Sequence, residues 1–346
     1  MKYRLNALPV KTTNGFHIND VEIDLDIEKY HYEHEGVIKG DLSKVMIEKS
    51  MKEESLSSKI GLSVKKYCNI KITIPKNVQM NQPIFLTYDF CKEDVFYSKI
   101  QFVYEENASC DFILSYQSQD QMKHFNYLVE NVISHKNSKG NITVINTLNS
   151  HSMMFYALEN DVLEKASITH TIIDLGGKVR LYNASSYLKE KDASNSLHTI
   201  YIGQKNELLD FNYYLKNLAS NTQNQMRVEG ALEDKSQKNF RGTIDFIKGC
   251  SHSVGEENEN CVLLSDTCMS RSLPQMLCEE EDVIGIHGVS SGKVDEEKLF
   301  YLMSRGFSQK EAEKFIILGN FMSIINEIPS NDVRESLVHR IEDLLS

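Results

Sequence analysis

The stretch that indicates the fold most directly is Asn239-Phe-Arg-Gly-Thr-Ile-Asp-Phe246, in which apolar or small residues alternate with polar ones. A period of two places successive side chains on opposite faces of a β-strand. The same alternation occurs at residues 226–229. Short apolar runs that fit strands recur upstream, at residues 101–104, 110–114, 142–148, 168–175, 198–202 and 208–215. The middle of the chain is therefore predicted to be mainly β.

Polar segments rich in turn-forming residues separate these runs, in the later part about every 15 residues. No proline lies between Pro83 and Pro274, and long amphipathic helical patterns are almost absent there. Strands at this spacing suit a β-sandwich or barrel, or the stacked turns of a β-solenoid. Because no repeat motif is visible, the pattern alone leaves these architectures open.

The two flanks differ from this middle region. Near the start we expect a strand over residues 21–27 and a helix over 41–51. We divide the chain into a mixed N-terminal segment at 1–80, the strand region at 81–286 and a helical subdomain at 287–346.

Capping residues predict three helices after residue 294. Asp295 can cap the first helix, and Gly306 is placed to end it. Ser308 and Glu311 match a capping box that opens a second, amphipathic helix. Ser330, which follows a proline, can cap the third. Three short helices cannot bury a core of their own, so they must pack on the strand region, on another subunit, or on both.

The composition narrows the classes of function. The chain has 346 residues, 41% of them hydrophobic and 25% charged, as in a folded globular protein. Its net charge of -11 disfavours binding to nucleic acid or to an anionic membrane. No apolar run approaches the roughly 18 residues of a membrane span, and the first residues lack a signal-peptide core, so we expect a cytoplasmic protein. No G-x-x-x-x-G-K-[ST] motif occurs, so we expect no nucleotide to bind to this chain itself.

Seven cysteines occur at irregular spacing without a C-x-x-C motif, which indicates neither a disulfide framework nor a zinc ribbon. Four of them lie between residues 250 and 278, next to His252 and His287.

From about residue 239 onward the sequence resembles the SufB/SufD family of iron–sulfur cluster assembly scaffolds. The resemblance covers roughly a third of the chain and is carried by residues 239–245, 260–266, 272–274, 287–306 and 311–312. It implies a right-handed parallel β-helix whose C-terminal helices dock a SufC-type ABC ATPase. It also implies a second SufB/SufD-like subunit, in a homodimer or a SufB–SufD heterodimer, with a transient iron–sulfur cluster near the interface. We therefore expect a noncatalytic scaffold subunit rather than an enzyme.

Two departures from the SufB pattern concern the cluster site. Where SufB-like chains carry His-Glu, this chain has His287-Gly288, so a carboxylate that could bind iron is missing. The SufB cysteine falls near Glu259, and Cys261 lies two positions further on, which on a strand is the same face. The sulfur-accepting cysteine of SufB has no match within residues 184–192. The chain is closer to SufD, or to the single scaffold subunit of a reduced SufB–SufC system.

Candidate site residues follow from this resemblance. Soft thiolate and imidazole ligands suit iron, so the cluster candidates are His287, Cys261, Cys268 and Cys278, with His287 and Cys261 as metal ligands. The simpler alternatives are a structural histidine and cysteines that pack as small apolar residues. The candidates for ATPase binding are Leu299, Phe300, Tyr301, Arg305, Gly306, Phe307 and Ser308. For the first three, inward packing is an equal alternative.

A second hypothesis from another class is a β-solenoid carbohydrate-active enzyme, such as a polysaccharide lyase or hydrolase. These enzymes need a groove with catalytic side chains and usually act outside the cell. The absence of a signal-peptide pattern argues against it.

Overall fold

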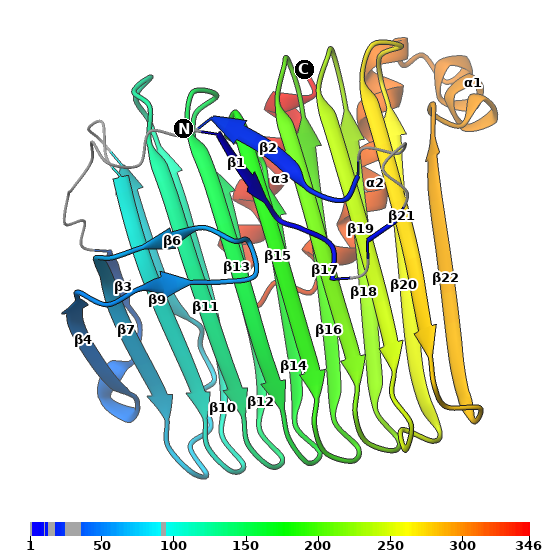
Figure 1. Cartoon of the computed structure of the whole chain (residues 1–346). Coiled ribbons are helices and arrows are strands. Elements are labelled where there is room, and N and C mark those ends of the chain that lie inside the picture. The colour runs from blue at the N-terminus through cyan, green and yellow to red at the C-terminus, as the bar shows by residue number, and fades with distance from the viewer. Residues whose placement is uncertain (1, 10, 13–17, 25–35, 91–94) are drawn as a thin grey trace.

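The computed structural model describes residues 2–9, 11–12, 18–24, 36–90 and 95–346. It is a parallel β-solenoid of about eight turns, in which successive strands alternate between two facing sheets of nine strands each (Figure 1). Sheet I contains β3 (Val37–Lys39), β8 (Ile84–Phe90), β10 (Ser109–Ser118), β12 (Lys139–Thr147), β14 (Ser167–Asp174), β16 (Ser194–Gly203), β18 (Gln223–Leu232), β20 (Ser253–Leu263) and β22 (Val283–Gly292). Sheet II contains β4 (Met46–Lys52), β7 (Tyr67–Ile74), β9 (Val95–Tyr104), β11 (Phe125–Ser134), β13 (Met153–Val162), β15 (Val179–Leu188), β17 (Leu208–Asn217), β19 (Gln237–Phe246) and β21 (Met269–Cys278).

One column of turns sets the repeat of the solenoid. Each of these turns holds one residue in the left-handed conformation, and such residues recur at intervals of 27 residues (Lys165 to Asp192) to 31 residues (Asn221 to His252). The turn spacing of about 15 residues expected from the sequence is therefore half of one solenoid turn. In six of these turns the residue after the left-handed position is small and buried, namely Ala108, Ser138, Ala166, Ala193, Thr222 and Ser253. Stacked corners leave room only for small side chains. The solenoid alternative is confirmed.

Alternation along the strands fills the interior. In β19, Phe240, Ile244 and Phe246 are buried on the inner face. Their register partners on β17 and β21 lie directly above and below them, so inward side chains of successive turns form rows. Aromatic rings stack between consecutive turns, with centroids 4.9 Å apart for Tyr88 and Tyr116. Such offset stacks add to the gain from apolar burial.

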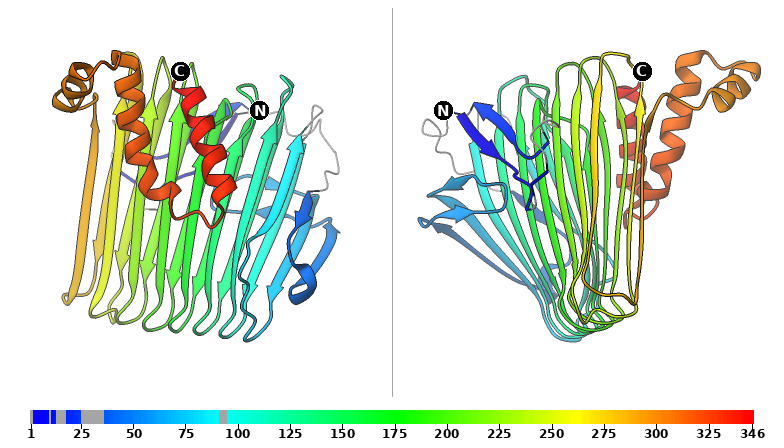
Figure 2. Two further views of the ribbon diagram at one scale, coloured as in Figure 1. Left: turned by 180° about the vertical axis from the view of Figure 1, so that it is seen from behind. Right: turned by 45° about the vertical axis from the view of Figure 1, so that its right-hand side comes forward.

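Both outer faces are covered by the ends of the chain. Helices α2 (Gln309–Ile325) and α3 (Asn331–Leu344) pack on the outer face of sheet I, and α1 (Glu296–Ser304) projects beyond β22 (Figure 2). Two small hairpins lie across sheet II, β1 (Lys2–Leu5) with β2 (Val21–Asp24) and β5 (Leu56–Ser57) with β6 (Ser63–Val64) (Figure 1).

The predicted helix over 41–51 is wrong. Asp41 caps only a single 3-10 turn at Leu42–Lys44, after which Val45 is extended and β4 begins at Met46. The β4 strand pairs antiparallel with β7 and completes sheet II, so pairing at the sheet edge overrides the local capping signal. Of the strand expected over 21–27, β2 accounts for the first four residues, and 25–27 lie outside the described residues.

The predicted caps of the C-terminal helices are confirmed. Asp295 accepts hydrogen bonds from the first-turn backbone of α1, and Gly306 follows that helix with a φ of +99°. Ser308 and Glu311 form the reciprocal capping box of α2. Ser330 accepts from the backbone of α3. Local sequence therefore suffices to set these boundaries.

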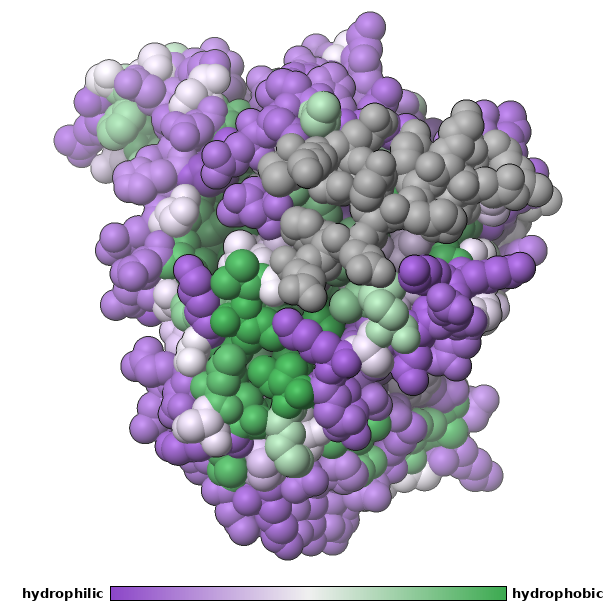
Figure 3. Space-filling model, turned by 90° about the vertical axis from the view of Figure 1, so that its left-hand side faces the viewer, coloured by the Kyte–Doolittle hydropathy of each residue, from purple (hydrophilic) through white to green (hydrophobic). Residues whose placement is uncertain are grey.

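The two ends of the solenoid differ. At the first turn, β3 and β4 pair antiparallel to their neighbours, and apolar side chains gather on this end of the molecule (Figure 3). Val37, Leu42 and Met46 are exposed there. At the other end, β21 and β22 are the outermost strands of their sheets, and each is paired on one side only.

Candidate functional site

The last turn of the solenoid brings several polar side chains to one inner face. The β20 and β22 strands run parallel, with Glu257 opposite His287 and Cys261 opposite Ser291. Odd-numbered residues of both strands therefore face the interior. Cys261 is 1% exposed, whereas His287 is exposed because no further turn covers it. The expectation that Glu259 and Cys261 share a face is confirmed.

A buried ion pair crosses the interior just below this last turn. Lys238 of β19 donates to the carboxylate of Glu259, and both side chains are fully buried. Lys238 also donates to Oγ of Ser272 at 2.8 Å, and Tyr201 donates to the Glu259 carboxylate at 3.5 Å. Burial raises the pKa of the Cys261 thiol, which keeps it in the neutral form that binds metal poorly. The inner face of β20 therefore carries Glu259 as the partner of Lys238 at the position that the sequence analysis compared with the SufB cysteine.

Glu257 is a second buried carboxyl group near this ion pair. It is fully buried, and neither of its carboxylate oxygens has a hydrogen-bond partner among the described residues. Burial, and then the nearby Glu259, raise the pKa of Glu257 to about 8. Its space exists because residue 242 is a glycine, since a Cβ there would lie 1.9 Å from Oε1 of Glu257. The sequence analysis missed Glu257.

The four predicted cluster ligands do not converge. His287 and Cys261 share the inner face but are four positions apart in register, roughly 13 Å along the strands. Cys268 lies in the turn after β20, where its thiol donates to the Ser265 carbonyl at 3.0 Å. Cys278 ends β21 at the opposite edge of the solenoid. Within the described parts of the chain, no group of three histidine, cysteine or acidic residues could hold a metal ion.

Helices α1 and α2 form an uncovered apolar surface. Phe300 is 75%, Tyr301 56% and Phe315 59% exposed. A hollow of about 480 Å³ lies between the two helices and is lined in part by Tyr301, Leu302, Phe315 and Ile316. The Arg305 guanidinium lies 5.3 Å from the centre of the Tyr301 ring.

The residues predicted to bind the ATPase divide into two groups around this surface. Leu299 packs partly into the core between the helices and sheet I. The other six are exposed, namely Phe300, Tyr301, Arg305, Gly306, Phe307 and Ser308. Phe315 of α2 also belongs to the exposed surface.

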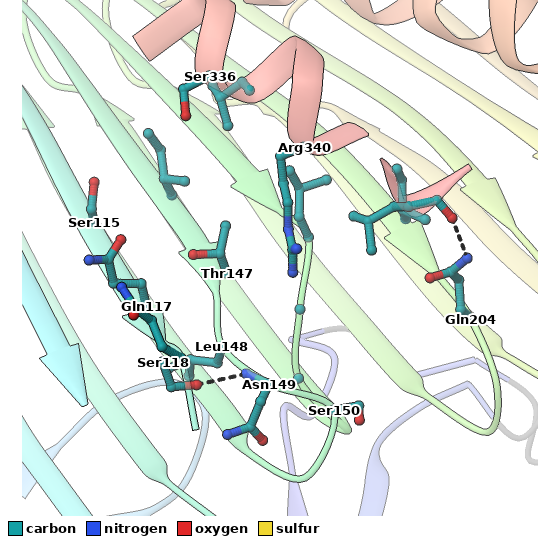
Figure 4. Close-up of a pocket in the computed structure, with 18 of the residues that line it drawn as sticks. Ser115, Gln117, Ser118, Thr147, Leu148, Asn149, Ser150, Gln204, Ser336 and Arg340 are labelled. Atoms are coloured by element: carbon teal, nitrogen blue, oxygen red, sulfur yellow. Dashed lines mark hydrogen bonds between the residues drawn. The ribbon is translucent and has the colours of Figure 1, made fainter. Parts of the chain in front are cut away.

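A separate polar cleft of about 740 Å³ lies between α3 and the outer face of sheet I. Arg340 extends into it from the helix, and Gln117, Thr147 and Asn149 line the opposite wall (Figure 4). Its lining, as far as the chain is described, contains neither histidine nor cysteine. Because these are the ligands that iron–sulfur chemistry requires, the cleft is not the candidate cluster site.

Comparison with known proteins agrees with this geometry. The sequence model of the family described as "SUF system FeS cluster assembly, SufBD core domain" matches residues 89–320, about two thirds of the chain. The chain belongs to the SufBD family. The SufBD core domain thus includes the solenoid from the end of β8 onward and most of α2, and it ends before α3 begins.

Curated SufBD relatives are similar over most of the chain. It is 25% identical to the iron-sulfur cluster assembly protein SufD of Bacillus subtilis over 280 residues, which are 78% of this chain and 62% of that protein. It is 24% identical to SufD of Escherichia coli over 185 residues, 53% of this chain and 44% of the relative. A SufBD family protein of Staphylococcus saprophyticus is 22% identical over 260 residues, 75% of this chain and 56% of its own length. The chain therefore spans about half to three fifths of these relatives.

SufBD membership favours an assembly component over the carbohydrate-active enzyme considered from the sequence. Among the described helices, none is long and apolar enough to cross a membrane.

Proposed function

We propose that this chain is a noncatalytic scaffold subunit of an iron–sulfur cluster assembly machinery, and that it binds a SufC-type ABC ATPase through α1 and α2. The observation that carries the ATPase part is the uncovered apolar surface of these two helices. Large exposed aromatic side chains around a hollow are typical of a protein-binding site. The chain lacks a P-loop, so ATP hydrolysis would be supplied by the partner.

Copurification tests the ATPase surface. The chain would be co-expressed with its cognate ATPase, with Phe300→Glu as the test variant and Met122→Glu as the matched control. Met122 is also an exposed apolar residue, with 50% of its surface exposed, but it lies on a turn of the solenoid and not on α1 or α2. We expect the wild-type chain and the control to form a stable complex and Phe300→Glu to lose it. Equal copurification of both variants would rule out this surface.

The open edge of β22 supports a second scaffold subunit as partner. The ten residues of β22 include no Asp, Glu, Lys or Arg, and Ile284 and Ile286 are 58% and 50% exposed. A long, uncharged edge strand readily pairs with another strand. We propose that a second copy, or a SufB-like subunit, pairs here.

The oligomeric state measured by light scattering distinguishes these pairings. Ile286→Lys places a charge on the exposed edge and should leave the chain monomeric if β22 forms the interface. A variant that stays as dimeric as the wild-type chain would refute this interface. Dimerisation only with a SufB-like subunit would identify the heterodimer.

His287 is the proposed contribution of this chain to a cluster at that interface. Its side chain is exposed on the inner face of the last turn, where a partner strand would meet it. Anaerobic reconstitution with iron and sulfide should give a cluster absorption that His287→Ala weakens. If neither this substitution nor loss of Cys261, Cys268 and Cys278 changes the absorption, the chain does not hold the cluster. A cytoplasmic location stays a prediction.

A further inference from the structure

We propose that the polar cleft between α3 and the outer face of sheet I binds a small organic acid, whose carboxylate pairs with Arg340. The cleft has a volume of about 740 Å³, which lies within the range of small-molecule sites. Arg340 extends into it from α3, and the ends of the sheet I strands form the opposite wall (Figure 4). Because α3 begins after the matched SufBD core domain ends, this cleft lies partly outside that core.

Two of the three acids in the lining are already paired. Glu207 forms an ion pair with the buried Arg180 at 2.8 Å, and Asp120 contacts the ring of the buried His124 at 2.8 Å. The third acid, Asp332, precedes Arg340 by eight residues, which is roughly 12 Å along a helix. The acids therefore leave the end of the cleft at Arg340 without a neutralising carboxylate.

The two cations of the cleft lie toward the C-terminal end of α3. Gln204 donates to the backbone carbonyl of Leu344 at 2.7 Å, which places the adjacent Lys205 beside this end of the helix. Arg340 lies one helical turn before Leu344. Neither Lys205 nor Arg340 forms an ion pair with another described residue. A ligand with a negative charge would supply the missing partner.

The neutral part of the lining fits a carbon skeleton with polar substituents. Leu148, Leu175, Ile202 and Leu337 form buried apolar patches within it. Five side-chain amides and four serine hydroxyls provide both hydrogen-bond donors and acceptors. None of the described lining residues is aromatic, so the cleft offers no ring on which a nucleobase could stack. These features favour an organic acid over a nucleotide.

The position of Arg340 favours a carboxylate over a phosphate group. Phosphate sites commonly use backbone N–H groups at the N-terminus of a helix. Toward the C-terminal end, where Arg340 lies, the helix dipole disfavours a doubly charged anion more than a singly charged one. A guanidinium binds a carboxylate through two parallel hydrogen bonds. Inorganic phosphate would also leave the apolar patches without a contact.

Packing holds Arg340 over the cleft. Leu337 and Ile341, on either side of it in the sequence, are buried in the core between the helices and sheet I. The Gln204 hydrogen bond ties down the end of the same helix. A ligand would therefore bind to a helix that is already fixed, which lowers the entropic cost of binding.

Isothermal titration calorimetry of the full chain tests this site. The probes are succinate, citrate, L-glutamate and benzoate, with inorganic phosphate as an anion that lacks a carbon skeleton. We expect at least one carboxylate to bind with a Kd of about 1 mM or tighter, and phosphate to bind at least about tenfold more weakly. Arg340→Met should weaken carboxylate binding by about tenfold or more, which corresponds to ~1.4 kcal/mol. Arg340→Lys keeps the charge without the paired hydrogen bonds and should have a smaller effect.

Arg4→Met is the matched control, because it removes the same charge from an exposed arginine on β1, far from the cleft. It should bind as the wild-type chain does. Gln117→Leu, on the wall opposite α3, should weaken binding as well. Circular dichroism would establish that each variant is folded.

Three results would overturn the inference. They are a wild-type chain that binds none of the four carboxylates, equal affinities of Arg340→Met and Arg4→Met, and phosphate binding as tight as that of the best carboxylate. None of them affects ATPase copurification, because the exposed aromatic surface belongs to α1 and α2 and not to α3.

Discussion

Replacing Arg241 should loosen the N-terminal segment from the solenoid. Arg241 belongs to the Asn-Phe-Arg-Gly stretch, but its side chain points outward and is completely buried under the start of the chain. It donates to the carboxylate of Asp210 on the neighbouring strand and, at 3.0 Å, to the backbone carbonyl of Ile18. Asp210 is also fully buried.

The magnitude follows from what Arg241→Met leaves behind. Among the described residues, the carboxylate of Asp210 would keep the side-chain amides of Asn6 at 2.6 Å and Asn239 at 3.0 Å as donors, without a cationic partner. Removing one partner of a buried ion pair typically costs about 3–5 kcal/mol. The two remaining amide donors place the expected loss near the lower end, about 3 kcal/mol.

Urea unfolding combined with hydrogen exchange would measure this effect. Solenoids unfold in parts, so exchange in residues 2–8 and 18–24 should rise more than in the central turns. The double variant Arg241→Met with Asp210→Asn should recover most of the loss, because no unpaired charge remains. If the double variant is no more stable than Arg241→Met, or if Arg241→Met costs less than about 1 kcal/mol, the ion pair is not the anchor.

Three further predictions concern turns, packing and pH. Asn107→Ala should cost about 1–2 kcal/mol in urea unfolding, because alanine disfavours the left-handed φ of 57°, and Asn107→Gly should cost less. Gly230→Ala should lower the free energy of unfolding by about 1–3 kcal/mol, because the new Cβ would lie 2.0 Å from the buried ring of Tyr201. Gly292→Ala is the control and should be nearly neutral, because no atom lies within 4 Å of its new Cβ. Equal effects of the two substitutions would contradict the packing argument. The hydrogen bond from His198 lowers the pKa of Glu327, so this contact stabilises helix docking above the ordinary pKa of 4.5 and is lost as the pH falls through the lowered value. Hydrogen exchange of the second C-terminal helix should therefore increase in acid, and Glu327→Gln should flatten that increase; an identical acid response in the variant would refute it.

The strands and the C-terminal helices could be predicted because their signals are local. Alternation at 239–246 and the caps at Asp295, Ser308 and Ser330 depend on a few neighbouring residues, and the structure contains them where expected. The prediction of a helix over 41–51 was wrong because this segment is governed by a distant part of the chain. Its pairing with β7 at the edge of sheet II makes it extended.

The repeat escaped detection because its positions share conformation rather than identity. The left-handed corner is occupied by Asn107, Asn137, Lys165, Asp192 and His252 in different turns. The small buried residue after the corner recurs in type from Asn107 onward, as alanine, serine or threonine. A search for that small residue at intervals of about 30 would have revealed the solenoid.

The candidate site was predictable only in part. The sequence pointed to His287 and placed Glu259 and Cys261 on one face, which needs only the period of a strand. Glu257 could not be found in this way, because an acid on a strand is expected to face solvent. Its burial depends on Gly242, which is fifteen positions away in the sequence and belongs to the other sheet.

The unlike ends of the solenoid bear on how large its assemblies can become. The first turn presents β3, only three residues long, and β4, whose exposed residues include Glu48, Lys49 and Lys52. The last turn presents the long, uncharged β22. If both ends of the solenoid could pair with another chain, chains could add head to tail without limit and form fibres. The pairing proposed above would use only the β22 end of each chain, so growth would stop after a single pairing event and give a closed pair instead of a filament.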